Sequence, residues 1–244
     1  MNTFGLITHG RSGTWALYEH FSQHPFVECF TYWFDGQQPI AKEPSAIRKN
    51  LQKNWHHQNW ISFLSSSPPN KTHLCTWTHY IQNSWIRENT PFSNDRDFWE
   101  SFRTNQQKII LLRRENLLRQ FLSGKIAKST GKYETYHPRK LDPKPIQIQI
   151  DPKFSNFVKE KQTADRKMRD IFGGTNYLEV VYEQLTTNWE SEIHRIQDFL
   201  GLYRVSIPIS THKQEHRPIR QIVQNYQEIE NYLRQQNWDH WLDD

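Results

Sequence analysis

Short apolar runs alternate with longer segments of helical spacing along this chain, and this alternation most constrains its fold. The runs FGLIT (4–8), KIILLRR (108–114) and NYLEVVY (176–182) have the length of buried strands, and helical patterns follow them. Strands of this length alternating with helices of ten or more residues predict a parallel sheet wrapped by helices. We therefore expect an α/β, P-loop-like three-layer fold with a central parallel sheet flanked by helices.

The remaining segments are assigned by the same patterns. THLCTWTHY (72–80) is rich in β-forming residues and is expected in the sheet, whereas residues 24–42 read as irregular. KPIQIQID (144–151) alternates strictly, which predicts a two-sided strand or an edge ribbon. An amphipathic helix is expected over 153–174, stopped by its two glycines, and the tail after Pro218 is expected to be helical.

Length, charge and cysteine content constrain the number of domains, the kind of ligand and the cellular compartment. The 244 residues show no break in composition, which predicts one domain over residues 1–244. The net charge of +5 favours an anionic ligand, although the charges are spread along the chain. Cys29 and Cys75 have no metal-binding or redox spacing, which indicates a reducing compartment. Without a leader or a run of about 18 apolar residues, we expect a cytoplasmic protein with no membrane partner.

The turn GRSGT (10–14) joins the first expected strand to the first expected helix. In an open parallel sheet, ligands lie beyond the carboxyl ends of the strands, where a helix N-terminus offers backbone N–H groups to an oxyanion. Two glycines allow close approach, two hydroxyls add donors and an arginine adds charge: Gly10, Gly13, Ser12, Thr14 and Arg11. An ordinary strand-to-helix turn with a Ser/Thr cap is the alternative.

A nucleotide P-loop competes for the same turn. Residues 5–12 formally fit the Walker pattern with arginine in place of lysine. However, Gly5 lies within the apolar strand, and a magnesium–nucleotide site needs an acidic residue at a neighbouring strand tip. The strand at 108–114 ends instead in Arg113 and Arg114, which suit additional phosphate without a metal. A P-loop kinase-like phosphotransferase is therefore the weaker alternative.

Three motifs occur in order along the chain: RSGTW after the first strand, IILLRRENLLRQFLS in mid-chain and VVYEQL followed by IQDFLGL near the end. Together they resemble the sulfotransferases that use 3'-phosphoadenosine 5'-phosphosulfate, particularly their bacterial, carbohydrate-type branch. The resemblance implies the sulfotransferase fold, that nucleotide as donor and its desulfated 3',5'-bisphosphate as product, and no metal. The implied reaction transfers a sulfuryl group to a hydroxyl or amine of a small polar acceptor.

The resemblance also implies roles for individual residues. The loop that grips the 5'-phosphosulfate corresponds to Arg11, Ser12, Gly13, Thr14 and Trp15. The 3'-phosphate site corresponds to Arg113 or Arg114 together with Ser123. Family members often separate this arginine and serine by eight residues, whereas the gaps here are ten and nine. Ser123 can still face the strand tip, because it lies two helical turns after Asn116.

Further positions border the nucleotide in this comparison. Tyr182 matches a position beside the adenine, although a tyrosine capping a core strand fits equally well. Lys213 and Arg217 lie in THKQEHRPIR (211–220), where the family closes a basic segment over the nucleotide. A solvated cationic loop is the alternative there.

The sequence leaves more than one candidate for the general base. The sugar-type branch carries a Gly–Glu pair after its His–Pro, and no such carboxylate follows His24-Pro25. The segment KTHL (71–74) resembles the one that holds the catalytic histidine of cytosolic sulfotransferases, which points to His73, with His79 as its rival. Histidine is suited to removing a proton near neutral pH. Glu28 and Glu43 are outside candidates.

Three function classes stay in view: a sulfotransferase, a family member that binds the nucleotide without catalysis, and a nucleic-acid-binding module. The tryptophans scatter through expected helices and strands and do not follow a basic face, so no nucleic-acid partner is expected. Residues 26–65 and 80–105 are expected to line the pocket of a small-molecule acceptor, a metabolite or a sugar. The chain is expected to act as a monomer or homodimer.

Overall fold

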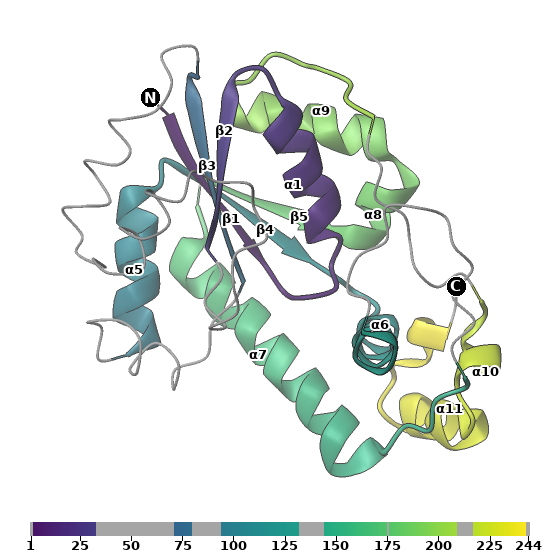
Figure 1. The fold of residues 1–244 in the computed structure, drawn as a ribbon. Helices are drawn as coiled ribbons and strands as arrows, with labels where there is room; N and C mark the ends of the chain where they lie inside the picture. The colour runs from purple at the N-terminus through teal and green to yellow at the C-terminus, as the bar shows by residue number, and fades with distance from the viewer. Residues whose placement is uncertain are drawn as a thin grey trace.

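A parallel sheet and the helices around it form the part of the chain that the computed structural model describes, residues 2–32, 71–79, 94–131, 144–174, 176–208 and 217–242 (Figure 1). The strands are β1 (Asn2–Thr8), β2 (Val27–Tyr32), β3 (His73–His79), β4 (Lys108–Arg113) and β5 (Tyr177–Val181). The helices are α1 (Thr14–Gln23), α5 (Asp95–Asn105), α6 (Leu117–Thr130), α7 (Ser155–Phe172), α8 (Tyr182–Thr187), α9 (Trp189–Leu200), α10 (Ile219–Ile222) and α11 (Tyr226–Gln235). A π-helical turn, η1 (Ile150–Phe154), precedes α7, and a 3-10 helix, η2 (Asp239–Leu242), follows α11.

The sheet places the carboxyl ends of its strands along one edge. Its order is β2-β3-β1-β4-β5, and every neighbouring pair is parallel. Thr8, the last residue of β1, lies opposite His79 of β3 and Leu112 of β4. The chain leaves β1 toward β2 and leaves β4 toward β5, in opposite directions across the sheet. A ligand crevice is therefore expected at the carboxyl ends of β1 and β4.

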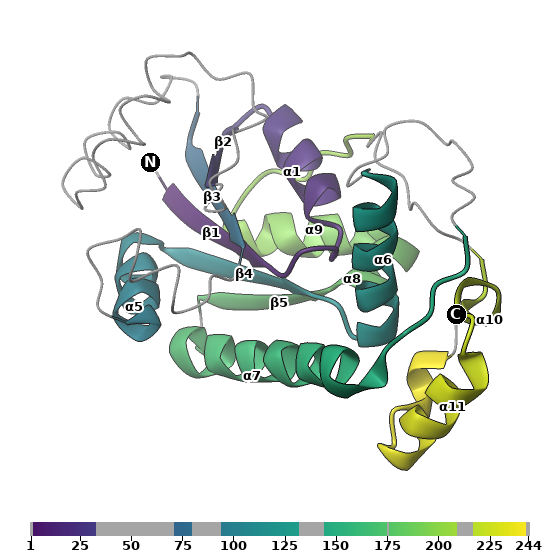
Figure 2. The same ribbon diagram turned by 60° about the horizontal axis from the view of Figure 1, so that its bottom comes forward.

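Helices cover both faces of the sheet, which gives three layers (Figures 1 and 2). Leu6 and Leu112 face α1 and α9 in one buried cluster, whereas their neighbours Ile7 and Leu111 face α5 and α7 in another. Gly5 lies inside β1, and a Cβ at this position would come within 2.5 Å of the Phe102 ring on α5. Gly5 thus serves helix packing within the strand, so it does not open a Walker loop.

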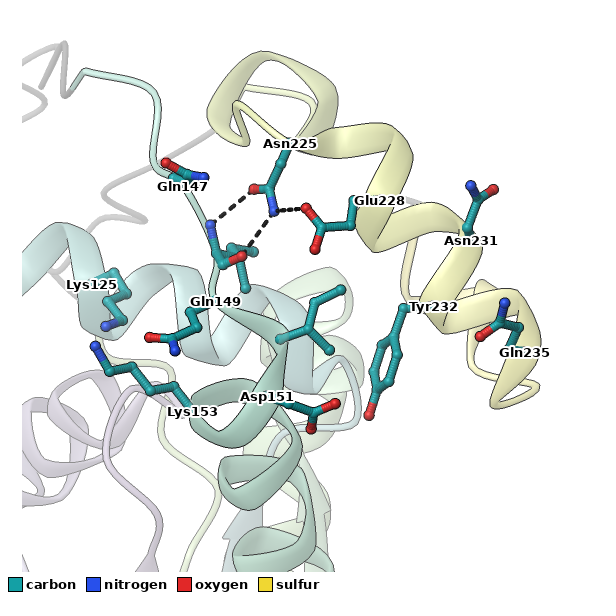
Figure 3. Close-up of a pocket in the computed structure, with 12 residues that line it drawn as sticks. Lys125, Gln147, Gln149, Asp151, Lys153, Asn225, Glu228, Asn231, Tyr232 and Gln235 are labelled. Carbon is teal, nitrogen blue, oxygen red and sulfur yellow. Dashed lines mark hydrogen bonds between the residues drawn. The ribbon is translucent and has the colours of Figure 1, made fainter.

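A third buried cluster lies beyond the carboxyl edge of the sheet. It joins α6 to the extended segment 144–150, to η1 and to the C-terminal helices. Figure 2 shows α10 and α11 at this end of the molecule, and Figure 3 shows segment 144–150 running alongside the start of α11. This cluster supports α6 from the side that faces away from the sheet.

The predicted α/β fold with a central parallel sheet is confirmed, and three local predictions are wrong. Residues 27–32, read as irregular, form the edge strand β2. Segment 144–151 does not join the sheet of described strands, and within the described part of the chain it forms an isolated bridge between Ile146 and Val223. The helical tail breaks between α10 and α11, because the backbone is extended at Val223. Within the described ranges, no helix combines the length and apolar character needed to cross a bilayer.

Candidate functional site

The loop from His9 to Gly13 carries the chain from β1 into α1 at the carboxyl ends of β1 and β4. Its backbone is left-handed at Arg11 (φ 69°) and at Gly13 (φ 79°), the residue that caps α1. Gly13 has no side chain that could cap this helix, and the first intrahelical bonds run from Ala16 and Leu17 to the Gly13 carbonyl. The backbone N–H groups that begin α1 therefore lack helical acceptors, and the helix dipole makes this end attractive to an anion.

Gly13 is required by packing as well as by its backbone angle. A Cβ on Gly13 would lie 2.7 Å from the ring of Tyr182, which follows β5 directly. The ring of Tyr182 thus lies against the loop. Tyr182 was expected to border an adenine or to cap a strand, and the structure places it against the loop at the carboxyl edge of the sheet.

Arg114 connects the tip of β4 to the same loop. Its guanidinium carbon lies 4.5 Å from the centre of the Tyr182 ring, and Nη1 donates to the Arg11 carbonyl at 3.3 Å. The side chain is only 8% exposed, and its nearest carboxylate, Glu183, is 3.5 Å from Nε. Burial lowers the pKa of Arg114, which the nearby Tyr182 and Glu183 partly oppose. A permanently charged group is thus held almost out of water beside the loop.

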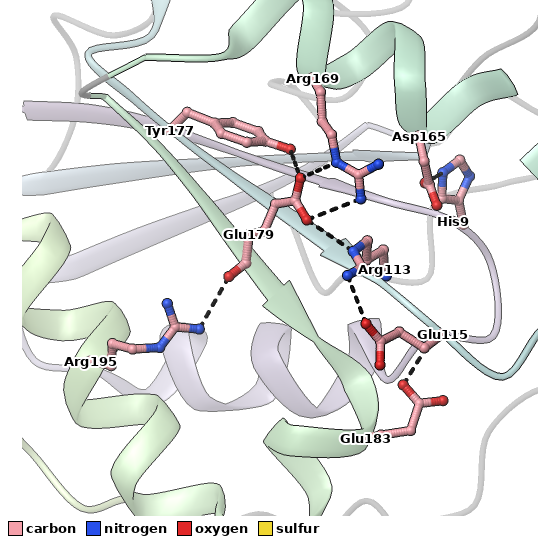
Figure 4. Close-up of polar contacts among 9 residues, drawn as sticks. All are labelled: His9, Arg113, Glu115, Asp165, Arg169, Tyr177, Glu179, Glu183 and Arg195. Atoms are coloured by element: carbon pink, nitrogen blue, oxygen red, sulfur yellow. Dashed lines mark hydrogen bonds and ion pairs between the residues drawn. The ribbon is translucent and has the colours of Figure 1, made fainter. Parts of the chain in front are cut away.

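Arg113 points to a different part of the molecule (Figure 4). It forms ion pairs with Glu179 of β5 at 2.9 Å and with Glu115 at 2.8 Å. Glu179 also accepts hydrogen bonds from Arg169 of α7 and from the Tyr177 hydroxyl. The two neighbouring arginines therefore do not form one phosphate site: Arg114 reaches the loop, and the charge of Arg113 is already balanced by carboxylates.

Helix α6 holds the loop from the other side. The side chain of Asn116 caps its first turn by accepting from the Arg119 backbone at 2.8 Å. One turn later, the Gln120 amide donates to the Gly10 carbonyl at 2.7 Å and to the Ser12 hydroxyl at 3.1 Å. Gln120 did not emerge from the sequence, although it shares the helix face of Asn116 and Ser123.

Ser123 lies at the loop, as its spacing from Asn116 predicts. Its hydroxyl accepts a hydrogen bond of 3.0 Å from Nε of Arg11. The side chains of Arg11 and Ser123 therefore meet, although 112 residues separate them in the sequence.

The other loop side chains are turned inward. The Ser12 hydroxyl is fully buried against Gln120, and Thr14 donates to the Thr8 hydroxyl at 3.0 Å. Trp15 is partly buried and packs edge-on against Tyr18 of the same helix. Ser12, Thr14 and Trp15 thus shape the loop from within.

The two candidate histidines lie at opposite ends of β3. His79 is opposite Thr8, where the loop begins, whereas His73 is opposite Asn2 at the other end of β1. Six residues of strand separate them by about 20 Å. The His73 ring is buried, where it contacts the side chains of Asn2 and Thr72, and burial lowers its pKa. His73 is therefore too far from the loop to act on a group held there, and that prediction is corrected.

His9 is a further residue at the loop that the sequence patterns did not single out. Its Nε2 lies 2.7 Å from Oδ1 of Asp165 on α7, and it is only 3% exposed. Burial lowers the pKa of His9, which the hydrogen bond to Asp165 partly opposes. This contact fixes the start of the loop to the helix layer on the far face. No local pattern reveals it, because the partners are 156 residues apart.

The tail reaches α6 close to this site. Arg119, itself buried, donates from Nη1 to the Arg217 carbonyl at 2.8 Å. Lys213 and Glu43 lie outside the described residues, as do most of residues 26–65 and 80–105, which were expected to line the acceptor pocket. Across the ranges that the structure covers, no three His, Cys, Asp or Glu side chains gather in a way that could hold a metal ion.

Neither a protein-family model nor a curated protein matches this sequence. Solved structures do: a sulfotransferase from Alicyclobacillus acidocaldarius superposes with a TM-score of 0.53 and 11% identity, over 99% of this chain and 96% of that one. The sulfotransferase domain of the Synechococcus PCC 7002 olefin synthase gives 0.49 and 15%, over 82% and 74%. Mouse sulfotransferase SULT7A1, complexed with PAP, gives 0.42 and 13%, over 86% and 60%. The first likeness shows that the chain has a sulfotransferase fold.

Proposed function

We propose that this protein transfers a sulfuryl group from 3'-phosphoadenosine 5'-phosphosulfate to a hydroxyl or amine of a small polar acceptor. One observation carries the proposal: the loop after β1 is held against Arg114 and α6 at the carboxyl ends of β1 and β4, in a chain with a sulfotransferase fold. PAP, the desulfated nucleotide, is present in the structure of the mouse sulfotransferase, which is consistent with this donor.

The residues at the crevice suit a nucleotide with two separate phosphate groups. The uncapped start of α1 and the side chain of Arg11 would hold the 5'-phosphosulfate. Arg114 and Ser123 would hold the 3'-phosphate. The buried Nε of Arg114 has no hydrogen bond within the described residues, and a buried donor of this kind is costly unless a ligand satisfies it. Tyr182 supplies a ring next to both groups.

In the donor, an activated sulfur–oxygen bond joins the sulfuryl group to the 5'-phosphate. This bond breaks as the acceptor oxygen or nitrogen bonds to sulfur. The protein has to align the acceptor, stabilise the negative charge that grows on the departing phosphate, and remove the acceptor proton. Arg11 and the amides of α1 lie where they would perform the second task. We assign the third to His79, because its position in β3 adjoins the start of the loop.

Nucleotide titration followed by a transfer assay tests this proposal. Calorimetry with the 3',5'-bisphosphate should show binding that Arg11→Ala weakens strongly, and radiolabelled donor should pass its sulfuryl group to members of a panel of small alcohols, sugars and amines. A protein that binds the nucleotide but transfers nothing would be the non-catalytic alternative. Equal binding by wild type and Arg11→Ala would contradict the assignment of the loop.

The strand that carries both histidines offers a matched test of the base. His79→Gln should lower the transfer rate at least about 100-fold, which is the usual contribution of a general base, and leave nucleotide binding unchanged. His73→Gln changes the same residue type at the distant end of β3 and should leave the rate near that of the wild type. Equal loss of activity in the two variants would contradict the assignment of His79.

A further inference from the structure

A second, polar groove lies between α6, segment 144–150 with η1, and α11 (Figure 3). It encloses about 880 Å³, and none of its lining residues belongs to the loop or contacts it in the interactions described above. Most of its lining side chains are amides or charged groups. The groove is therefore a separate place on the molecule where a ligand could bind.

The floor of the groove is held rigidly by hydrogen bonds. The backbone of Ile146 donates to the Ile222 carbonyl at 2.6 Å and accepts from Gln224 at 2.9 Å. The side chain of Asn225 continues this pairing, since its amide accepts from the Ile148 N–H at 2.9 Å and donates to the Ile148 carbonyl at 2.8 Å. A preformed floor lowers the entropy that a ligand must lose on binding.

The strict alternation of segment 144–151 now has a structural reason. Ile148 is buried in the cluster around α6, whereas Gln147 and Gln149 on either side of it are exposed and line the groove. Asn231 and Gln235 of α11 line it as well. Each of these amides offers both a donor and an acceptor, which is what a row of sugar hydroxyls requires.

One end of the groove is positively charged. Figure 3 shows Lys125 and Lys153 with their ammonium groups directed toward one another beside Gln149. Lys125 lies over the Phe121 ring, 5.2 Å from its centre, and neither lysine forms an ion pair within the described ranges. Both lysines line the groove, and an anion bound at this end would be attracted by both charges. This end is thus suited to a sulfate or a carboxylate.

The other end differs in charge. There the Asp151 carboxylate lies by the hydroxyl of Tyr232, whose ring offers a flat apolar face. Glu228 also lines the groove. Evenly spaced phosphates, as in a nucleic acid, would meet these carboxylates, whereas sugar hydroxyls can donate to them.

We infer that this groove binds an anionic oligosaccharide, with its sulfate or carboxylate group between Lys125 and Lys153 and its hydroxyls against the amides. Such a site goes beyond the transfer reaction, because it would hold a sugar chain whether or not the crevice between β1 and β4 contains a nucleotide.

Binding of a sulfated chondroitin tetrasaccharide to the full-length protein without nucleotide tests the inference. Lys125→Gln with Lys153→Gln should weaken binding at least about tenfold, because each lost contact is charge-assisted. The matched control, Lys128→Gln with Lys159→Gln, removes the same charge from exposed positions of α6 and α7 outside the groove. It should retain wild-type affinity, and thermal unfolding should show that both pairs of variants are folded.

Two further measurements are needed. The first separates the contribution of the amides to binding from that of the lysine charges, and the second shows whether the groove binds independently of the proposed nucleotide site. Gln147→Ala with Gln149→Ala should weaken binding about fivefold while both lysines remain. Arg11→Ala should bind the tetrasaccharide as the wild type does, even if it no longer binds nucleotide. Absence of binding, equal weakening by the two lysine pairs, or tighter binding of a single-stranded DNA of equal charge would overturn the inference.

Discussion

Two consecutive arginines at the end of β4 lie in opposite kinds of surroundings. Arg113 is enclosed by carboxylates, with Glu179 at 2.9 Å and Glu115 at 2.8 Å. Arg114 is more deeply buried, yet its nearest carboxylate is 3.5 Å away and its buried Nε has no hydrogen bond within the described residues. The first charge is paired with two carboxylates at hydrogen-bonding distance, whereas the second has one carboxylate at 3.5 Å and lies beside the loop that follows β1.

Under the proposed function, this difference separates a structural role for Arg113 from a binding role for Arg114. A buried charge is costly unless it is paired and hydrogen-bonded. Arg113 meets that condition, and it ties β4 to β5 and, through Glu179, to Arg169 of α7. Arg114 meets it only in part, so we expect a ligand phosphate to complete its surroundings. The same reasoning distinguishes neighbouring residues that sequence alone treats as equivalent.

The largest effect should come from Arg114. We expect Arg114→Met to weaken binding of the 3',5'-bisphosphate about 100-fold, since a charged hydrogen-bonding group in a nearly dry site contributes about 3 kcal/mol. Adenosine 5'-monophosphate lacks the 3'-phosphate and should lose much less affinity. Calorimetry with both nucleotides gives this ratio directly. An equal loss for both would show that Arg114 does not recognise the 3'-phosphate.

Arg113→Met should show the reverse pattern. Removing this guanidinium leaves Glu179 with fewer partners in a half-buried position, so we expect a loss of about 2 kcal/mol in the free energy of unfolding. Nucleotide affinity should stay within about threefold of the wild type. Urea unfolding and calorimetry on this variant and on Arg114→Met test the comparison in both directions. Arg113→Met binding as weakly as Arg114→Met would contradict it.

The network around Arg113 should also respond to acid. Burial alone would raise the pKa of Glu179, but hydrogen bonds from Arg169, Arg113 and Tyr177 lower it from 4.5 to about 2. Because the folded-state pKa is the lower one, the carboxylate stabilises the fold above about pH 4.5 and loses this contribution as the pH falls toward 2. For a partly exposed side chain we expect about 1 to 2 kcal/mol.

Urea unfolding of wild type and Glu179→Gln measures this contribution. The difference in unfolding free energy between the two proteins should be largest near pH 7 and should shrink between pH 4.5 and 3. Glu100→Gln is a suitable control, because its pair with Arg96 is exposed on the surface of α5. A difference between wild type and Glu179→Gln that does not change with pH would show that the ion pairs do not set this pKa.

The sequence predicted the frame of the molecule well, because strands buried on both sides and amphipathic helices leave periodic apolar patterns. β4 is an example: its apolar run IILL is buried in full. β2 was not predicted, because it is an edge strand with one neighbour and its sequence VECFTY mixes polar and apolar residues. Segment 144–150 alternates between apolar and polar residues as a strand does. Its partner is the chain around Val223, and no local sequence pattern predicts that pairing.

Prediction of the site was limited by information that only the fold contains. The loop and Ser123 could be named from short motifs, since their spacing along one turn or helix determines where they lie. The choice between Arg113 and Arg114 depends on carboxylates from β5, and the choice between His73 and His79 depends on strand register. Gln120 and the contact between His9 and Asp165 also depend on distant partners.

The smallest effect we predict concerns Ser123, which supports the loop through its hydrogen bond from Arg11 at 3.0 Å. Ser123→Ala should weaken binding of the 3',5'-bisphosphate about fivefold, because one hydrogen bond contributes about 1 kcal/mol. Ser129→Ala is the matched control: its hydroxyl lies on the same helix and, among the residues that the structure describes, bonds only to the Ile126 carbonyl of its own turn. Tighter binding by Ser123→Ala would mean that the serine competes with the nucleotide for Arg11, and Arg114 would then be the sole side chain of the pair that recognises the 3'-phosphate.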